Sequence, residues 1–342
     1  MRLNLALQGG GAHGAFTWGV LDRLLEEPAL DIAGISGTSA GALNAAALKA
    51  GLLQGGAEGA RAALNELWAA VEAAGDFRVT DWFRAAFPVA AAWGDVAAAH
   101  LPFSPAGLAA QLTTPYAWGP LWQNPLRKVV ERFDFSQICK GQGPDLFVSA
   151  TNVRSGKIRV FAGTEITPDA LLASACLPTV FQAVEMDDPA TGQREAFWDG
   201  GFTGNPALFP LYQPHLPADI LLISINPLRR EALPHSPMEI QDRINEIGFN
   251  AALLGELRAI AFVKRLIAEG RMPAGAMKDV RLHLIADDKL MNDLSAGSKL
   301  NPTPALLARL KTAGRQAAEG WLKRHAAQVG QESSVDLRGL FG

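Results

Sequence analysis

Two consecutive segments at the start of the chain share one pattern, and this repetition constrains the fold more than any other feature. Residues 2–7 are predicted to form a buried strand, the glycine run 9–11 follows, and the apolar residues up to Glu27 then recur at helical spacing. In "IAGISGTSAGALNAAALKAGL" a second strand is expected to end at Ile35 or Ser36, before a tight turn and an alanine-rich helix. Two strand–turn–helix units in succession predict parallel neighbouring strands.

The rest of the chain continues this alternation, which places it in the α/β class. Further strands are predicted at 145–151, 157–162, 220–226 and 280–286, and helices near 168–177, 237–270 and 302–325. Two extended pieces flank a turn-rich centre within residues 181–201, which predicts a hairpin that ends at Asp199. We therefore expect a single domain over residues 1–325, with a mainly parallel sheet covered by helices, and a mobile tail over 326–342.

One stretch, from about residue 76 to 135, departs from this pattern. It is rich in aromatic residues among prolines and glycines and is predicted to be a helical insert. Its aromatic side chains either fill a small core of their own or form a lid or a lipid-facing surface. The second interpretation predicts peripheral membrane contact through residues 82–122. The chain has no apolar run of about 18 residues, so no membrane-spanning helix is expected.

Bulk composition excludes several classes of function. The 342 residues are 49% hydrophobic and 19% charged with a net charge of -3, which is typical of a soluble globular protein and gives no reason to expect nucleic acid binding. Cys139 and Cys176 lack metal-ligand spacing, so we expect no metal, no cofactor and a reducing compartment. The N-terminus lacks the apolar region of a signal peptide, which predicts a cytoplasmic protein. The sequence indicates no particular oligomeric state.

The glycine run at residues 9–11 predicts an anion-binding turn. Backbone N–H groups at the start of a helix attract a phosphate or a transient oxyanion. The spacing Gly9-x-Gly11-x-x-Gly14 also matches the dinucleotide-binding fingerprint, and Asp31 follows about 20 residues later. However, Asp31 precedes its predicted strand, whereas a ribose-binding acid is expected at the end of one. Nucleotide binding is therefore disfavoured.

The second turn carries a candidate nucleophile. Gly37-Thr38-Ser39-Ala40-Gly41 is a G-x-S-x-G sequence between a predicted strand and a predicted helix, which is the context of a nucleophile elbow. A glycine-rich turn with a helix-capping serine is the alternative interpretation. If the two units are neighbours, both turns open at the same edge of the sheet. The N–H groups of the loop Gly9, Gly10, Gly11 and Ala12 would then face Ser39 as an oxyanion hole.

A serine nucleophile needs a base, and the sequence offers two kinds. Asp199 is followed by Gly200 and Gly201, which would let its carboxylate approach closely, although Asp-Gly-Gly is also a common turn. The alternative is a histidine after Asp199, which would complete a Ser-Asp-His order: His215, His235, His283 or His325. None of these histidines has a supporting motif.

Four blocks in this order, "QGGGAHG", "GTSAG", "ASACLPTVF" and "DGGFTGNPAL", resemble the patatin-like phospholipase family over residues 3–210. The resemblance implies a three-layer fold, a dyad of Ser39 and Asp199 without a catalytic histidine, an oxyanion hole from the glycine loop, and hydrolysis of glycerolipid acyl esters. An aspartate that acts as base should be desolvated, because burial raises the pKa of a carboxyl group.

One residue departs from the family pattern: His13 stands where the family's glycine loop commonly carries Arg or Lys. An unperturbed imidazole is largely neutral at pH 7, so a fixed positive charge is not expected there. Leu177-Pro178-Thr179 and Asn205-Pro206 are expected to shape the pocket or to hold the Asp199 loop. Two other functions share these motifs, namely an acyltransferase that uses the same dyad and a catalytically silent lipid-binding scaffold.

Overall fold

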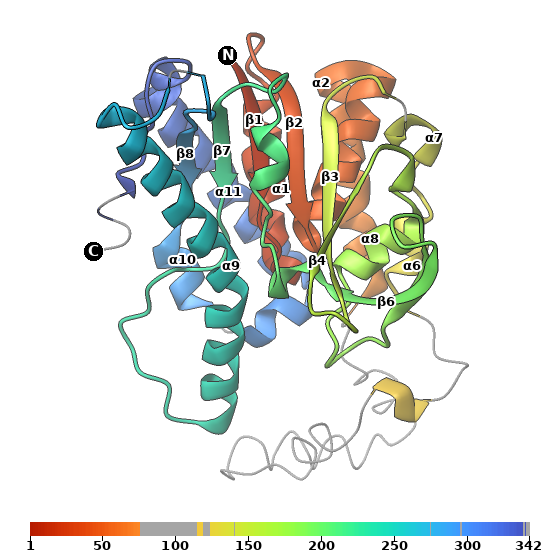
Figure 1. The fold of residues 1–342 in the computed structure, drawn as a ribbon. Helices are drawn as coiled ribbons and strands as arrows, with labels where there is room; N and C mark the ends of the chain where they lie inside the picture. The colour runs from red at the N-terminus through yellow and green to blue at the C-terminus, as the bar shows by residue number, and fades with distance from the viewer. Residues whose placement is uncertain are drawn as a thin grey trace.

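A central sheet with five neighbouring parallel strands organises the described part of the chain (Figure 1). The computed structural model describes residues 1–75, 115–118, 124–139, 141–273, 275–294, 296–337 and 339. In spatial order, the parallel strands are β3 (Asp145–Asn152), β2 (Asp31–Thr38), β1 (Arg2–Leu7), β7 (Asp219–Ile223) and β8 (Arg281–Ile285). The prediction of a mainly parallel sheet is confirmed. The second strand continues to Thr38, two to three residues beyond its expected end.

Three antiparallel strands, β4 (Ile158–Ala162), β5 (Val184–Asp188) and β6 (Gln193–Asp199), complete this sheet. β5 and β6 form the predicted hairpin, and β4 and β6 both pair with β3. Ser149 of β3 pairs with Thr38, and the next residue, Ala150, pairs with Asp199. The ends of β2 and β6 therefore meet along the same side of β3, which brings the residue after Thr38 close to Asp199.

Helices cover both faces of the sheet. Successive side chains of a strand point to opposite faces, so Leu3, Leu5 and Leu7 enter one core and Ala6 enters the other. The first core is closed by α1 (Gly14–Leu24), α2 (Ala40–Ala74), α8 (Pro168–Ser174) and α11 (Pro304–His325), and the second by α9 (Pro237–Ala268). This arrangement confirms the three layers that the resemblance implies.

Short helices connect these elements. Those of the α type are α6 (Arg127–Val130), α7 (Phe135–Ile138) and α10 (Asp288–Asp293). Those of the 3-10 type are η1 (Gly11–His13), η2 (Pro115–Trp118), η3 (Gly163–Glu165), η4 (Gly200–Phe202), η5 (Phe209–Tyr212), η6 (Ala296–Leu300) and η7 (Ala326–Gln328).

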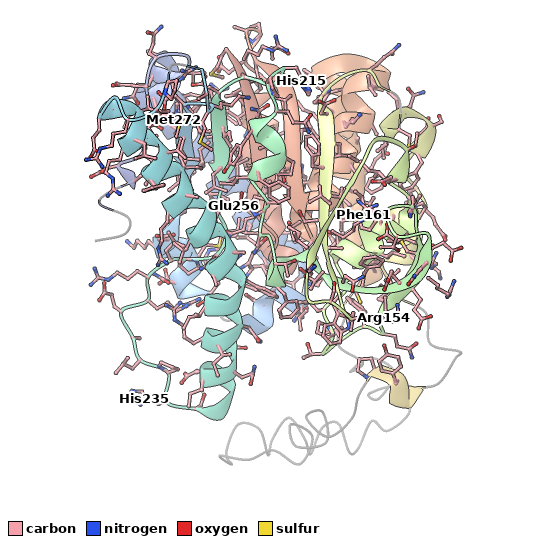
Figure 2. The ribbon with its side chains drawn as sticks, viewed as in Figure 1. Arg154, Phe161, His215, His235, Glu256 and Met272 are labelled. Carbon is pink, nitrogen blue, oxygen red and sulfur yellow. The ribbon has the colours of Figure 1, made fainter. Side chains whose placement is uncertain are left out.

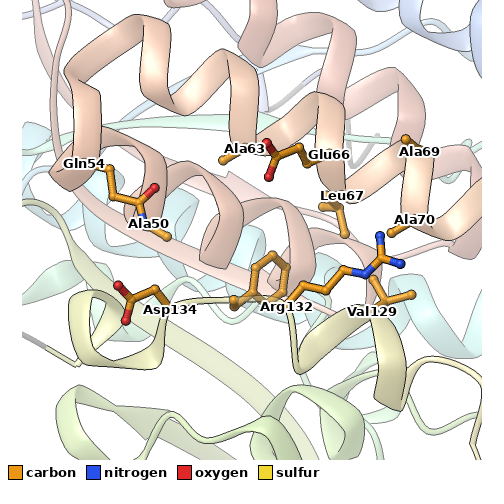
Figure 3. A pocket seen from close by; sticks show the side chains of 11 residues that line it. Ala50, Gln54, Ala63, Glu66, Leu67, Ala69, Ala70, Val129, Arg132 and Asp134 are labelled. Atoms are coloured by element: carbon orange, nitrogen blue, oxygen red, sulfur yellow. The ribbon is translucent and has the colours of Figure 1, made fainter.

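Helix α2 is longer than the predicted alanine-rich helix and folds back on itself at Gly55 and Gly56, whose backbone angles are not helical. Its two halves approach closely, since a Cβ atom on Gly51 would lie 2.4 Å from the carbonyl oxygen of Gly59. Glycine at these positions thus permits the close packing of the two halves. A cavity of about 260 Å³ lies between α2 and the segment of α6 and α7 (Figure 3). Ser39 does not line it.

Most of the predicted insert lies outside the described residues. Within 76–135 the structure describes residues 115–118 and 124–135, where η2 and α6 form and α7 begins. The expected membrane contact through residues 82–122 stays a prediction, because all but residues 115–118 of that range fall outside the described part. Among the described residues, none of the helices combines the length and the apolar character needed to cross a bilayer.

The described part of the tail contacts the sheet, while its expected mobility stays a prediction. The N–H of Gly330 donates to Asp219 (2.8 Å), and the N–H of Ser334 donates to the carbonyl of Leu282 in β8 (3.1 Å). Leu337 is buried in the second core. Backbone pairing with the edge strand β8 and this apolar contact hold the segment, and sequence composition alone shows neither.

Candidate active site

Ser39 stands at the turn between β2 and α2 in a strained backbone conformation. Its φ is 55° and its ψ is −125°, and no other non-glycine residue in the described ranges has a positive φ. Its N–H donates to the Ser174 hydroxyl (2.9 Å), which fixes the turn. Such a conformation costs on the order of 1–3 kcal/mol and is the kind of strained turn expected for a nucleophile elbow. The predicted elbow geometry at Gly37–Gly41 is therefore present.

Asp199, at the end of β6, is only 2% exposed. Burial raises the pKa of its carboxyl group to about 7, while hydrogen bonds from the Gly201 N–H and the Ser39 hydroxyl act to lower it. The Gly201 N–H lies 2.7 Å from Oδ1. The backbone of Asp199 is fixed as well, since its carbonyl accepts from the Thr151 hydroxyl (2.8 Å) and its N–H donates to the Cys176 carbonyl (2.8 Å). The expected desolvation of this carboxylate is confirmed.

The glycine loop passes directly beside the serine. A Cβ atom on Gly9 would lie 2.6 Å from the Thr38 carbonyl oxygen and 2.7 Å from Cβ of Ser39, so a side chain has no room there. The Gly9 N–H already donates to Oδ1 of Asn205 (2.7 Å). This corrects one part of the expected oxyanion hole: Gly9 positions the loop, and its N–H is engaged. The N–H groups of Gly10, Gly11 and Ala12 remain the candidate donors.

Two adjoining cavities of about 40 Å³ each meet at Ser39. They share Gly11, Ser39, Leu177 and Lys299. One contains the polar groups of the site, and its other lining residues are Gly9, Gly10, Asp199, Asn205 and Phe249. The other is apolar, with further walls from Ala40, Leu43, Leu67, Trp68, Val71, Leu126, Ala175, Phe181 and Leu300. The serine thus separates a compartment with hydrogen-bonding groups from an apolar one. Leu177 lines both cavities and Asn205 lines the first, as expected of residues that shape the pocket.

His13 is buried behind the glycine loop and is neutral. Burial, together with the positive charges of Lys299 and Arg230, lowers the pKa of its imidazole to about 3. Its Nε2 is hydrogen-bonded to the Ser298 hydroxyl (2.7 Å). The expectation that this position carries no fixed positive charge is confirmed. The other glycines of the motifs are buried around the site: Gly14, Gly37, Gly41, Gly200 and Gly201.

The four histidines considered as alternative bases, and Asp31 considered as a ribose-binding acid, lie outside this site. His215 pairs with Asp145 at the beginning of β3 (2.7 Å), and His235 lies before α9 (Figure 2). His283 contacts Asp219, and His325 contacts Gln328. Neither cavity at Ser39 includes any of them. Asp31 is the first residue of β2, at the opposite end of the strand from the glycine loop.

The site also contains residues that sequence reasoning missed. Asn226 donates from Nδ2 to the Gly9 carbonyl (2.7 Å), and Lys299 donates from Nζ to Oδ1 of Asn226 (2.7 Å). Asn226 follows the end of a parallel strand, which is a signal for a site residue, whereas Lys299 has no motif around it. In the parts of the chain that the structure describes, no cluster of three His, Cys, Asp or Glu side chains could hold a metal ion.

Comparison with known proteins gives similar structures and a family match. Two solved structures are similar: VipD from Legionella pneumophila (15% identity, TM-score 0.41, 95% of this chain and 67% of that chain) and the type III effector protein ExoU (18% identity, TM-score 0.32, 94% and 53%). The chain thus spans about two thirds of the first structure and about half of the second. No curated protein matches. A family model described as patatin-like phospholipase matches residues 5–212. Because this match covers more than half of the sequence, the chain belongs to the patatin-like phospholipase family.

Proposed function

We propose that this chain is a lipid acyl hydrolase that cleaves carboxylic esters of glycerolipids through an acyl-enzyme on Ser39. Membership of the patatin-like phospholipase family supports lipid hydrolase activity. The observation that carries the more specific proposal is the placement of Ser39, the buried carboxylate of Asp199 and the glycine loop around one cavity. A nucleophile, a base and backbone donors are the three components that acyl transfer requires.

Acylation begins when Asp199 accepts the proton of the Ser39 hydroxyl while Oγ bonds to the ester carbonyl carbon. A carboxyl group with a pKa of about 7 is a better base for this transfer than one with an ordinary pKa of 3.8. The carbonyl electron pair moves to oxygen, and the N–H groups of Gly10 and Gly11 stabilise the resulting oxyanion. The bond to the alcohol oxygen then breaks, and that oxygen takes the proton from Asp199.

Deacylation repeats these steps with water. Asp199 removes a proton from the water molecule, whose oxygen attacks the acyl carbon and forms a second oxyanion in the same place. When this intermediate collapses, the bond to Ser39 Oγ breaks and Oγ recovers the proton from Asp199. The fatty acid leaves, and the free serine is restored.

The apolar cavity supports an acyl group as the part of the substrate that enters the site. Its walls are carbon side chains from α2, from Leu126 before α6 and from the segment after α8. A volume of about 40 Å³ holds little more than water-sized groups, so these walls must separate to admit a long chain. An apolar compartment next to the nucleophile favours an acyl ester over a charged acyl donor.

The proposal is tested by mass spectrometry after treatment with a fluorophosphonate, which forms a covalent adduct with activated serines. We expect one adduct at Ser39 in the wild-type protein and none in Ser39→Ala. Asp199→Asn is expected to lower ester hydrolysis by about 10³-fold or more. Asp187 is exposed on the same hairpin, so Asp187→Asn serves as the matched control and should leave activity unchanged. Folded wild-type protein without an adduct at Ser39 would contradict the proposal and favour a lipid-binding scaffold.

An acyltransferase would use the same acyl-enzyme but pass the acyl group to an alcohol. The distinction is made by product analysis with and without an added lysophospholipid as acceptor. A hydrolase releases fatty acid in both reactions, whereas a transferase converts the acceptor into its acylated product and releases less fatty acid.

A further inference from the structure

A segment far from the motifs in the sequence packs against the glycine loop. This segment, η6 (Ala296–Leu300), lies outside the residues 5–212 that the family model matches. Ser298 is hydrogen-bonded to Nε2 of His13 (2.7 Å). The carbonyl oxygen of Lys299 would lie 2.2 Å from a Cβ atom on Gly11, so only a glycine fits beneath it. Gly11 also has a φ of 58°, a conformation that glycine adopts without strain.

The side chain of Lys299 extends along this loop. Its Cβ is near Gly11, and its Nζ donates to Oδ1 of Asn226 (2.7 Å). The Nδ2 of Asn226 donates in turn to the carbonyl of Gly9 (2.7 Å). A continuous chain of hydrogen bonds therefore leads from the ammonium group of Lys299 to the Gly9–Gly10 peptide. Gln8 fixes the middle of this chain, because its Oε1 accepts from the N–H of Asn226 (2.9 Å).

The peptide at the end of this chain carries a candidate oxyanion donor. A trans peptide is planar, so its C=O and N–H point in opposite directions. Fixing the Gly9 carbonyl on the Asn226 side consequently fixes the direction of the Gly10 N–H. Hydrogen bonds in a chain also polarise one another, so the bond from Lys299 to Asn226 strengthens the Gly10 N–H as a donor.

The charged groups near Ser39 also indicate a role for Lys299. Among the described residues that line the two cavities at Ser39, Lys299 alone has a basic side chain. Burial lowers the pKa of its ammonium group, Glu246 and Asp242 act to raise it, and Arg230 acts to lower it. Glu246 pairs with Arg230 (2.6 Å) and Arg243 (3.0 Å), so two guanidinium groups compensate much of its negative charge. A positive charge close to the site of a developing oxyanion lowers the energy of that state.

We propose that Lys299 is a positioning residue of the acyl-transfer site, which acts through Asn226 to hold the Gly10 N–H toward the oxyanion and contributes positive charge there. This inference rests on the proposed function and adds a residue from the C-terminal part of the chain to it. The neutral His13 leaves the loop without a cation of its own, and Lys299 supplies one from a different element.

The experiment compares Lys299→Met and Lys299→Arg with the wild type, using a short-chain p-nitrophenyl ester. We expect Lys299→Met to lower kcat about 10- to 100-fold with KM changed less than about twofold, because the lost interaction develops mainly in the transition state. Lys299→Arg keeps the charge and should recover most of the lost kcat. Lys323→Met removes an exposed lysine of α11 and is the matched control, with unchanged kcat.

Two results would overturn the inference: a folded Lys299→Met with kcat close to that of the wild type, or a Lys299→Arg as impaired as Lys299→Met. A double-mutant cycle tests the route through Asn226. We expect Lys299→Met combined with Asn226→Ala to lose less than the product of the two single losses, whereas independent effects would contradict that route.

Amide hydrogen exchange separates this inference from the proposed function. Residues 8–14 should exchange faster in Lys299→Met than in the wild type and Lys323→Met, and unchanged exchange would count against a role for Lys299 in holding the loop. This readout needs no ester hydrolysis. If the wild type neither labels at Ser39 nor hydrolyses esters, the proposed function fails while the exchange measurement still tests whether Lys299 orders the loop.

Discussion

At the scale of single residues, the burial of Asp199 determines both reactivity and pH dependence. The proposed base must be ionised, and burial raises its pKa to about 7. We therefore expect kcat/KM for a neutral ester to rise with pH and to level off above a midpoint near 7. Rates measured between pH 5 and 9 on a substrate without ionisable groups check this. A profile that is flat across this range, or one with a midpoint near 4, would exclude Asp199 as the base.

The same carboxylate should reduce the stability of the fold at neutral pH. Its pKa in the folded state, about 7, lies above the ordinary value of 3.8. Below about pH 4 the carboxyl group is protonated in both states and the fold keeps its full free energy of unfolding, and this stability is lost as pH rises through 7. A shift of about three pKa units corresponds to about 4 kcal/mol at most. An asparagine cannot ionise, so the free energy of unfolding of Asp199→Asn minus that of the wild type should be larger at pH 8 than at pH 4. Urea titrations at both pH values measure this gain, and an equal difference at both would refute it.

At the scale of elements, the approach of two strand ends explains why residues 160 positions apart form one site. β2 and β6 use the same side of β3, so Thr38 and Asp199 pair with consecutive residues of that strand. The sequence indicates both strand ends, because G-x-S-x-G and Asp-Gly-Gly are turn patterns. It does not indicate that β6 pairs with β3 directly beyond the end of β2, since that depends on pairing between distant strands.

The apolar cavity leads to a prediction about chain length. Leu126, just before α6, is buried and lines the apolar cavity next to Ser39, whereas Val130 is buried in the same segment and does not line it. Leu126→Ala should enlarge this cavity and raise the ratio of kcat/KM for a dodecanoyl ester to that for a butanoyl ester several-fold. Val130→Ala is the control, since it creates a comparable void away from the cavity. An equal ratio in both variants would show that this wall does not limit the acyl chain.

At the scale of the whole molecule, the sequence predicts the strands of the sheet well but not the contacts that η6 and the tail make with distant elements. The strands at Leu3–Leu7 and Ile220–Ile223 are recognisable because both of their faces are buried, which gives mostly apolar runs, with Asn4 as the one polar residue in them. The position of Lys299 could not be predicted, because no local pattern connects η6 with a loop almost 300 residues earlier. The contacts of the tail could not be predicted for a related reason: its residues carry no local pattern, and the partners of Ser333 and Ser334 lie on β8.

The contacts of this tail predict a role in stability without one in chemistry. Residues 333 and 334 bond to Leu282 of β8, a strand with no further neighbour in the described sheet, and Leu337 enters the core beneath α9. Ending the chain after His325 would free the edge of β8 and expose apolar surface. We expect a loss of about 2–4 kcal/mol and a stronger tendency to aggregate, measured by thermal unfolding and size-exclusion chromatography.

The truncated chain should still react with a fluorophosphonate at Ser39 below its unfolding temperature. Gly330 contacts Asp219 at the beginning of β7, whereas Ser39 follows the end of β2, at the opposite edge of a parallel sheet. Gln331→Ala, which changes an exposed side chain in the same segment, controls for effects of sequence alone. Loss of labelling in a folded truncated chain would mean that the two edges of the sheet are coupled. Retained labelling together with lowered stability would show that the tail stabilises the fold through its bonds to β8 and has no part in the reaction at Ser39.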